Sequence, residues 1–426
     1  GFYNNLLNVL DPEDVENVEV IRNGTSLYGA RGANGVLKIT TRRGKSMVTR
    51  IKIRAYGGFE MVPDQLPVMN GTQYRSYVSE FLGTTLADNL TSAEVSRRLG
   101  ATFLNEDAAS NLFYPMYHNN TDWQKNLYHS AFTQNYKVSV EGGDDVAMYN
   151  LSLGYAAGEA TAKNNDFNRL NIRFNTDVLM FDNFTAAFDL GYVRNAYNLR
   201  DNGWAMDYTN RNISSPNVLG LIQAPFLSPY AHNVMYEPGV GLMLAHSDGT
   251  TGRAVYSGKN PGDLTNPFNF ATGFGTQYSG FANPFWILQN GSGDNKNYQE
   301  QTQFNINFAP KYQINKYLYV ENRFSYILNR ANEKYYLPND GTPNKSVANL
   351  GLVRSTVRSQ FSKQTSIYND LHASWNRHFG AHYINLLGGF RLASYSFNNT
   401  WMVGYNNSND KMPDMSNGLQ YRDYGG

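Results

Sequence analysis

The chain has 426 residues and a formal net charge of +1, contains no cysteine, and is charged at only 17% of its positions. The near-zero net charge gives no electrostatic reason to expect nucleic-acid binding. The lack of cysteine excludes disulfides, zinc–thiolate sites and cysteine nucleophiles.

Aromatic residues make up 14% of the chain, with 31 Tyr and 24 Phe, which suits strands and turns better than helices. No apolar run approaches the roughly 18 residues of a transmembrane helix, and the mean hydropathy is −0.51. A membrane β-barrel agrees with these values, because its alternating strands average out as polar. The sequence begins at Gly1 without Met or a signal peptide, so we expect that this is not the biological start.

The first predicted elements are two strands joined by a glycine-rich loop. Residues 15–24 (VENVEVIRNG) and 36–42 (VLKITTR) alternate as strands, and SLYGARGANG lies between them. The glycine spacing fits neither nucleotide-binding fingerprint, and a strand follows where those loops need a helix. We predict instead a structural loop, in which glycines relieve backbone clashes. Its key residues are Tyr28, Gly29, Arg31, Gly32, Asn34 and Gly35.

Longer alternating segments follow along the chain. The first covers 46–60, and four more lie at 132–143, 146–158, 167–180 and 183–195. Two further pairs are predicted at 300–314 with 316–330, and at 364–379 with 381–397. In the four consecutive strands one face carries Tyr136, Val138, Leu151, Leu153, Leu170, Ile172, Phe188 and Leu190, and the other carries Lys137, Glu141, Arg173, Asn175, Asp177 and Asp189. A short helix is expected at 91–99, where Thr91 and Glu94 fit a capping box.

Long and short connections alternate along these strands. Tight turns are predicted at 142–145, 181–183, 314–316 and 379–380, and long loops at about 61–130, 197–297, 331–362 and 398–426. An outer-membrane barrel has such short turns at one rim and long loops at the other, whereas a Greek-key sandwich has no reason to segregate loop lengths. A soluble many-stranded protein is the alternative. A closed eight-stranded barrel would leave no interior space for the segment before Ser46.

Residues 15–45 (VENVEVIRNGTSLYGARGANGVLKITTRRGK) closely resemble the end of the plug domain of TonB-dependent outer-membrane transporters. They are most similar to the SusC/RagA branch of Bacteroidota, and 121–143 and 149–178 resemble the first barrel strands of that family. The resemblance implies an all-β fold: part of a 22-stranded transmembrane antiparallel β-barrel, with residues 1–45 as the C-terminal part of an internal plug and 46–426 as the N-terminal portion of the barrel. The chain has about nine predicted strands, so we expect it to be a fragment or partial chain that lacks the TonB box.

The resemblance also implies an activity and partners. The family imports large ligands, such as oligosaccharides or oligopeptides, across the outer membrane of Gram-negative bacteria. A SusD-like surface lipoprotein forms a lid, TonB pulls on the plug, and SusC–SusD pairs form dimers. Two alternatives stay open at this point: a siderophore or cobalamin receptor, and a non-transporting β-rich surface adhesin or glycan-binding protein.

Candidate ligand or lid contacts come from the loop of about 100 residues after residue 197, because loops of this length are usually functional or disordered. The candidates are Trp204, Tyr208, Tyr230, Tyr236, Phe268 and Trp286. Aromatic faces suit sugar rings or peptides, although most such residues pack against neighbouring protein. The seven His have no metal-binding spacing, and nothing brings two acids together as a glycosidase needs. We therefore predict no enzyme activity, no metal and no cofactor.

Overall fold

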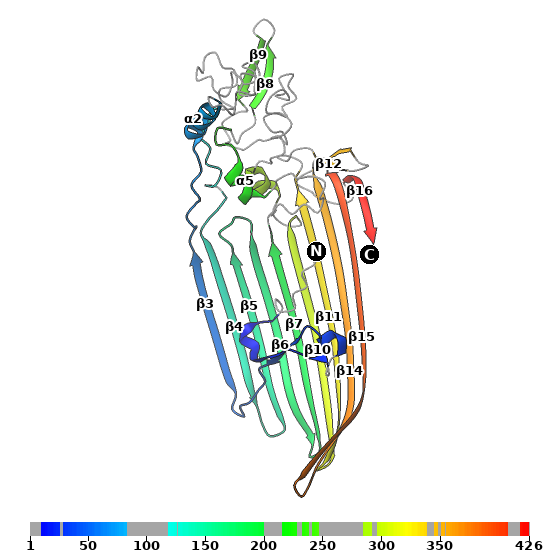
Figure 1. Cartoon of the computed structure of the whole chain (residues 1–426). Helices are drawn as coiled ribbons and strands as arrows, with labels where there is room; N and C mark the ends of the chain where they lie inside the picture. Colours follow the sequence, from blue (N-terminus) through cyan, green and yellow to red (C-terminus); the bar gives the residue numbers. More distant parts are fainter. Residues whose placement is uncertain are drawn as a thin grey trace.

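The computed structural model describes residues 10–25, 29–82, 118–125, 127–199, 215–227, 232–237, 241–246, 284–291, 296–338, 345–347, 351–353, 355–407 and 418–425. Its main element is one antiparallel sheet of ten strands, each paired with its neighbours in chain order (Figure 1). The strands are β3 (Arg50–Glu60), β4 (Ala131–Gly143), β5 (Ala147–Glu159), β6 (Asp166–Phe181), β7 (Phe184–Asn198), β10 (Tyr298–Asn315), β11 (Leu318–Leu337), β14 (Thr356–Phe379), β15 (His382–Asn407) and β16 (Gly418–Gly425).

Short turns join the strands at one end of the sheet, and longer connections, at 61–130, 199–297, 338–355 and 408–417, join them at the other (Figure 1). The exception at that end is the short connection 160–165 between β5 and β6. The turns at 144–146, 182–183, 316–317 and 380–381 lie where the sequence predicts them. In the first turn the Asp144 Oδ1 accepts hydrogen bonds from the backbone N–H groups of Ala147 (2.8 Å) and Val146 (2.9 Å). Both hydrogen bonds lower the pKa of Asp144, and the bond from Ala147 has the larger effect.

Three strands extend into segments that the sequence predicts as long loops. β11 continues to Leu337, although its residues Asn329–Lys334 are mostly polar, and β14 already begins at Thr356, so both occupy parts of the loop predicted at 331–362. β15 continues to Asn407, inside the loop predicted at 398–426. β16 had no counterpart among the nine predicted strands and lies within 398–426. The upper part of β11 and the whole of β16 lie at the end of the sheet where the long connections are. Polar side chains on both faces of a strand hide its period of two, so alternation cannot detect it.

The two faces of the sheet differ in polarity along the four consecutive strands β4–β7. Cross-strand neighbours keep side chains of one kind together: Leu153 lies opposite Val138 and Ile172, whereas Ser152 lies opposite Ser139 and Arg173. The faces predicted for the four consecutive strands are therefore confirmed by the observed register. We call the polar face, which the N-terminal segment contacts, the inner face, and the apolar face the outer face.

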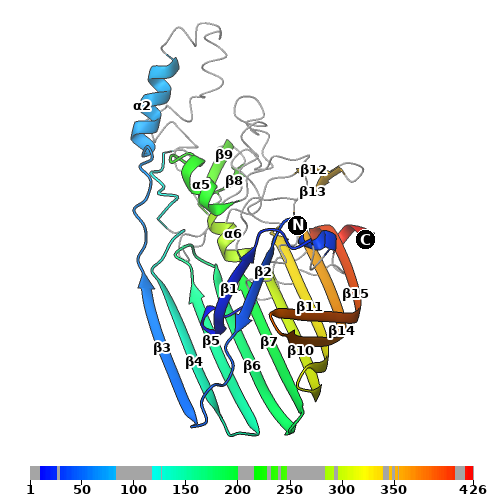
Figure 2. The ribbon, with the colours of Figure 1, turned by 60° about the horizontal axis from the view of Figure 1, so that its bottom comes forward.

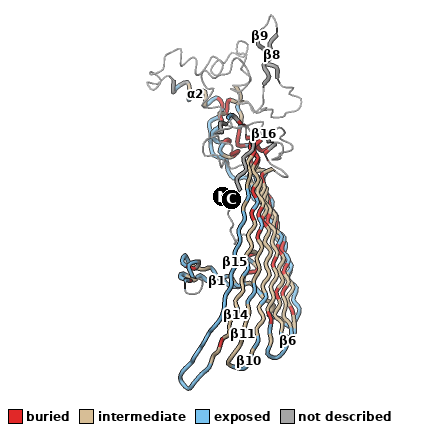
Figure 3. The backbone as a smooth tube through the Cα atoms, turned by 90° about the vertical axis from the view of Figure 1, so that its right-hand side faces the viewer, coloured by how far each residue is buried: buried red, intermediate tan, exposed pale blue. Residues whose placement is uncertain are grey.

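The N-terminal segment, residues 10–45, lies against the inner face of the sheet (Figure 2). It comprises η2 (Pro12–Asp14), β1 (Val15–Ile21), η3 (Gly29–Gly32) and β2 (Val36–Thr41), and β1 and β2 pair as an antiparallel ribbon. Seen from the side, the large sheet is one layer and β1 stands to one side of it (Figure 3).

The glycine loop between β1 and β2 brings two backbone segments into direct contact. The Gly24 N–H donates to the Gly32 carbonyl at 3.1 Å. A Cβ on Gly32 would lie 2.6 Å from the carbonyl carbon of Gly24, and Gly29 and Gly35 have φ of +62° and +95°. The loop thus needs glycine at 32 for space, and at 29 and 35 for backbone conformation.

Segments of the long connections lie above the sheet (Figure 1). They include α2 (Gly71–Leu82), α5 (Pro216–Ile222), β8 (His232–Glu237), β9 (Gly241–His246), α6 (Pro284–Asn290), β12 (Lys345–Val347) and β13 (Gly351–Val353). Leu219 and Ile287 form a buried cluster with Leu337 at the end of β11. The helix expected at 91–99 lies outside the described residues. In the part of the chain that is described, no helix has the length and apolarity to cross a membrane.

We predict that Gly32→Ala opens the loop between β1 and β2, because its methyl group cannot fit beside the Gly24 carbonyl. The expected loss of stability is about 1–3 kcal/mol, confined to the N-terminal segment. Limited trypsin digestion should then cut faster at Arg22 and Arg42. Gly388→Ala is the matched control, since a Cβ there meets no atom within 4 Å. Equal cleavage of the two variants would contradict the role of Gly32.

Candidate functional site

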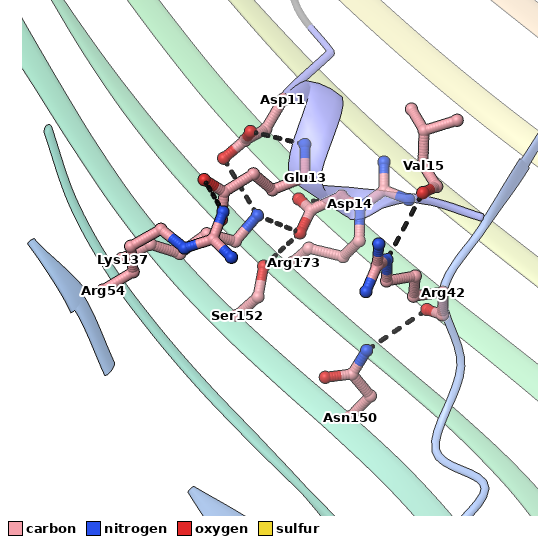
Figure 4. A network of polar contacts seen from close by, with 10 residues as sticks. All are labelled: Asp11, Glu13, Asp14, Val15, Arg42, Arg54, Lys137, Asn150, Ser152 and Arg173. Atoms are coloured by element: carbon pink, nitrogen blue, oxygen red, sulfur yellow. Dashed lines mark hydrogen bonds and ion pairs between the residues drawn. The ribbon is translucent and has the colours of Figure 1, made fainter. Parts of the chain in front are cut away.

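The N-terminal segment is attached to the inner face of the sheet through buried charges (Figure 4). The Lys137 Nζ, on β4, lies 3.0 Å from Asp11 Oδ2 and 2.6 Å from Asp14 Oδ1. The Ser152 hydroxyl, on β5, donates to Asp14 Oδ1 at 2.9 Å, and Arg173 Nε, on β6, lies 3.7 Å from Asp14 Oδ2. We call these five residues the lysine cluster. The side chains of Lys137, Asp11 and Asp14 are at most 10% exposed, so the ion pairs are shielded from water.

Local structure presents both carboxylates to the sheet. Asp11 is the N-cap of η2, and its Oδ1 accepts the Glu13 N–H at 3.0 Å while its Oδ2 faces Lys137. Burial alone would raise the pKa of Asp11. The Glu13 N–H bond and then the Lys137 ammonium outweigh it, so the pKa lies below its ordinary value. Asp11 thus stays ionised against the lysine.

A second group of charges holds the end of the N-terminal segment. The Arg43 Nε lies 2.8 Å from Asp177 Oδ2 on β6, and its Nη1 lies 2.5 Å from Asp189 Oδ1 on β7. The Asn175 amide also donates to Asp189 at 2.8 Å. Burial opposes the charge on Arg43, but its hydrogen bond to Asp177 and the charge of Asp189 raise its pKa. We call these four residues the arginine cluster.

Weaker contacts complete the attachment. The Arg54 Nη1 lies 2.8 Å from Glu13 Oε1, and Lys45 pairs with Glu16. The Asn150 amide donates to the Arg42 carbonyl at 3.2 Å. A Cβ on Gly44 would lie 2.4 Å from the Tyr149 carbonyl oxygen, so the segment touches the backbone of β5 there.

The inner face explains why acidic residues are needed at 11–14. Arg54 and Lys137 are direct cross-strand neighbours on β3 and β4, and Gly154 lies on the other side of Lys137. Like charges opposite each other are destabilising unless anions compensate them. Asp11, Glu13 and Asp14 supply those anions. The sequence offered a signal in the acidic residues of LDPEDVENVEV, but not the register that pairs them with Lys137.

The ligand or lid candidates from the sequence stay predictions. Trp204, Tyr208, Tyr230 and Phe268 lie outside the described residues, as does Tyr28 of the glycine loop. The backbone of Tyr236 is in β8 and that of Trp286 is in α6, whereas Arg31 lies in η3 and Asn34 in the turn before β2.

A different tryptophan organises the described part of the long connections. Trp123 is 2% exposed, its Nε1 donates to the Ala224 carbonyl at 3.0 Å, and its ring lies 5.1 Å from that of Phe285. It therefore joins the connection after β3 to the residues just after α5 and to α6, both in the connection after β7. We call this packed region around Trp123 and the Leu219 cluster the rim platform. Within the described ranges, no group of three or more His, Asp or Glu is placed to hold a metal ion.

Comparison with known proteins gives matches by sequence and by structure, although no protein-family model matches. TonB-dependent receptor SusC of Bacteroides thetaiotaomicron is 26% identical over 181 residues, which are 42% of this chain and 16% of that protein. TonB-dependent receptor P3 of Formosa agariphila is 21% identical over 89% of this chain and 30% of its own length. A chain of the RagAB peptide importer in its closed-closed state superposes with a TM-score of 0.63 at 18% identity, over 98% of this chain and 44% of its own.

By sequence and fold, the chain groups with TonB-dependent receptors of the SusC/RagA type. This confirms the resemblance seen in residues 15–45 and the all-β barrel fold class. The chain spans less than half the length of each of these relatives. From here on we use plug segment as the name for residues 10–45 and wall as the name for the ten-stranded sheet.

We predict that Lys137→Met detaches the plug segment, because Asp11 and Asp14 then stay buried without their ammonium partner. Removing one partner of a buried ion pair costs about 3–5 kcal/mol. An isolated two-stranded ribbon is marginal in water, so amide hydrogen exchange of β1 and β2 should accelerate. Lys52→Met is the control: Lys52 pairs with Glu141 on the same face but is 61% exposed, and an exposed pair contributes at most about 1 kcal/mol. Unchanged exchange in Lys137→Met would refute the buried role.

Acid should loosen the same contact. Because the pKa of Asp11 is lower in the folded protein, its stabilising contribution is complete above the ordinary value of 3.8 and declines as pH falls below it. Urea titrations can follow a fluorophore on Val20→Cys, unique because the chain has no cysteine. We expect the midpoint to fall between pH 5 and pH 3. Asp11→Asn should reduce this fall, whereas Glu19→Gln, in an exposed pair with Lys38, should keep it.

Proposed function

We propose that the chain is part of an outer-membrane transporter that imports a large ligand in a TonB-dependent manner. The observation that carries this proposal is the charged attachment of the plug segment to the inner face. Such a plug must fill the lumen at rest and yet be displaceable, and ion pairs meet both demands. Their strength depends on geometry, and water can solvate the separated charges.

We also propose that a SusD-like surface lipoprotein sits on the rim platform and encloses the ligand with it, and that TonB engages the receptor outside this chain. The support is the likeness to SusC and to the RagAB peptide importer. The packed segments at the long-connection end offer a structured surface at the right rim. Dimers of such receptor–lipoprotein pairs remain part of this proposal.

The ligand class is an oligosaccharide or an oligopeptide. Matching relatives include SusC and several TonB-dependent receptors of Formosa agariphila, and these names favour neither a siderophore nor a cobalamin ligand. The same relatives are receptors rather than enzymes, which supports a transport role for the chain.

A covalent link between plug segment and wall should stop import. Asp14→Cys with Ser152→Cys places two thiols where a carboxylate and a hydroxyl now lie 2.9 Å apart, and no other cysteine competes. Cells carrying the full receptor are given a fluorescent casein digest or labelled starch oligosaccharides, with and without a protonophore. We expect energy-dependent uptake of one probe, loss on oxidation of the double variant, and recovery on reduction.

The two single-cysteine variants control for the loss of Asp14 and Ser152 themselves, since they cannot form the bridge. Uptake by the oxidised double variant at the rate of the reduced one would contradict plug displacement. Uptake that is insensitive to the protonophore would contradict TonB-dependent import. The probe that is taken up decides between the peptide and the glycan.

A further inference from the structure

The outer face of the wall carries a row of cations at one level. The register places Leu170, Arg194, Thr302, Arg330, Lys363 and Asn398 side by side on β6, β7, β10, β11, β14 and β15. These positions alternate with inner-face residues such as Asp189 and Arg173, which contact the plug segment, so the row faces outward. Three of its six members are cations.

Below the row, toward the short turns, the outer face is mostly apolar. On β11 the outward residues from Leu328 to Leu318 include Tyr326, Phe324 and Val320, with Asn322 as the polar exception. Ten residues of strand span about 33 Å, and a tilt of about 40° reduces this to about 25 Å of height. That is the height of the apolar band of a membrane barrel. The cation row therefore lies at headgroup level on the side of the long connections.

Inside the row, Arg330 and Lys363 lie directly opposite each other on adjacent strands. Cross-strand like charges destabilise a sheet unless something neutralises them. Arg330 is exposed and Lys363 partly exposed. In the described part of the chain neither forms an ion pair with a carboxylate.

Two carboxylates of the outer face lie near the row, and both are engaged. At the level of Lys334, the Asp166 Oδ1 accepts a hydrogen bond from the Asn198 amide at 2.9 Å. Glu300 is the next outward residue of β10 above the row. It accepts hydrogen bonds from Arg194 Nε at 3.0 Å and Nη2 at 2.5 Å. Lys334 adds another cation above the row, with its Nζ 5.7 Å from the centroid of the Tyr298 ring. The patch thus has four cations and two anions, and a negatively charged ligand would compensate its excess positive charge.

We propose that Arg330 and Lys363, together with Arg194, bind the phosphate of a lipid headgroup in the membrane leaflet at the long-connection rim. The lipid tails lie along the apolar band below the row, and the phosphate bridges the two opposed cations. A basic side chain near a membrane surface contributes about 1 kcal/mol to binding an anionic lipid. The site rests on the membrane location proposed above but is separate from the plug and the import path.

Native mass spectrometry of the full-length receptor in detergent tests the site. The probe is dioleoyl phosphatidic acid, with dioleoyl glycerol as the same lipid without phosphate. We expect the receptor to retain the phosphatidic acid, and the R330Q/K363Q variant to retain at least about fivefold less. The control Lys52→Gln removes a positive charge from the inner face and should bind like the unmodified receptor.

Three results would overturn the proposal: equal retention by R330Q/K363Q, equal retention of dioleoyl glycerol, or displacement of the bound lipid by excess inorganic phosphate. Import measured in cells is a separate readout, because the double variant keeps every plug–wall contact. Loss of lipid retention with normal import supports the site.

Thermal unfolding of Arg330→Gln gives an independent check. Without anionic lipid the variant should unfold at a higher temperature than the unmodified receptor, because the like-charge opposition is gone. With phosphatidic acid in the micelles it should unfold at a lower temperature, because the ligand then stabilises only the intact site. The same sign under both conditions would overturn the proposal.

Discussion

Each strand of the wall faces two surroundings at once, and this constraint shapes the whole structure. Successive side chains point to opposite faces, so a strand can present apolar groups outside and polar groups inside only by strict alternation. A shift of one residue in any pair would exchange the two sets. The observed register keeps Leu153 beside Val138 and Ser152 beside Ser139. The plug contacts and the outer cation row both depend on that registration.

A polar inner face needs partners from elsewhere in the chain. Lys137 and Arg54 lie side by side, and no acid lies directly opposite either of them on β3, β4 or β5. The compensation comes from Asp11, Glu13 and Asp14, more than a hundred residues away from Lys137 in sequence. At the other end of the segment the signs are reversed, since Arg43 enters a site lined by Asp177 and Asp189. This reversal fixes the direction of the plug segment on the wall.

Alternation and turn chemistry were sufficient to predict the faces of β4–β7 and the tight turns. They favoured a barrel over a soluble many-stranded protein, and the resemblance of residues 15–45 to a known family then implied the barrel fold class. They could not predict the lysine cluster, because a period of two assigns Lys137 to a face but does not say which distant segment covers it. They also gave no sign of β16 or of the upper part of β11, where the polar sequence hides the period. The aromatic residues of the long connections could be identified but not ranked from the sequence, which gave no reason to select Trp123, a residue buried at the rim platform.

Charges, rather than apolar packing, fasten the plug segment to the described wall. On β1 the large apolar side chains Val18 and Val20 are 52% and 71% exposed, so they contribute little packing against the sheet. A buried ion pair gains little net free energy, because its attraction offsets the cost of removing both charges from water. When the segment moves away, water solvates those charges again and offsets part of the lost attraction. An apolar contact would gain no such favourable hydration when it separates. The same pairs demand one geometry for reattachment. The contact is therefore specific in position and separable under force.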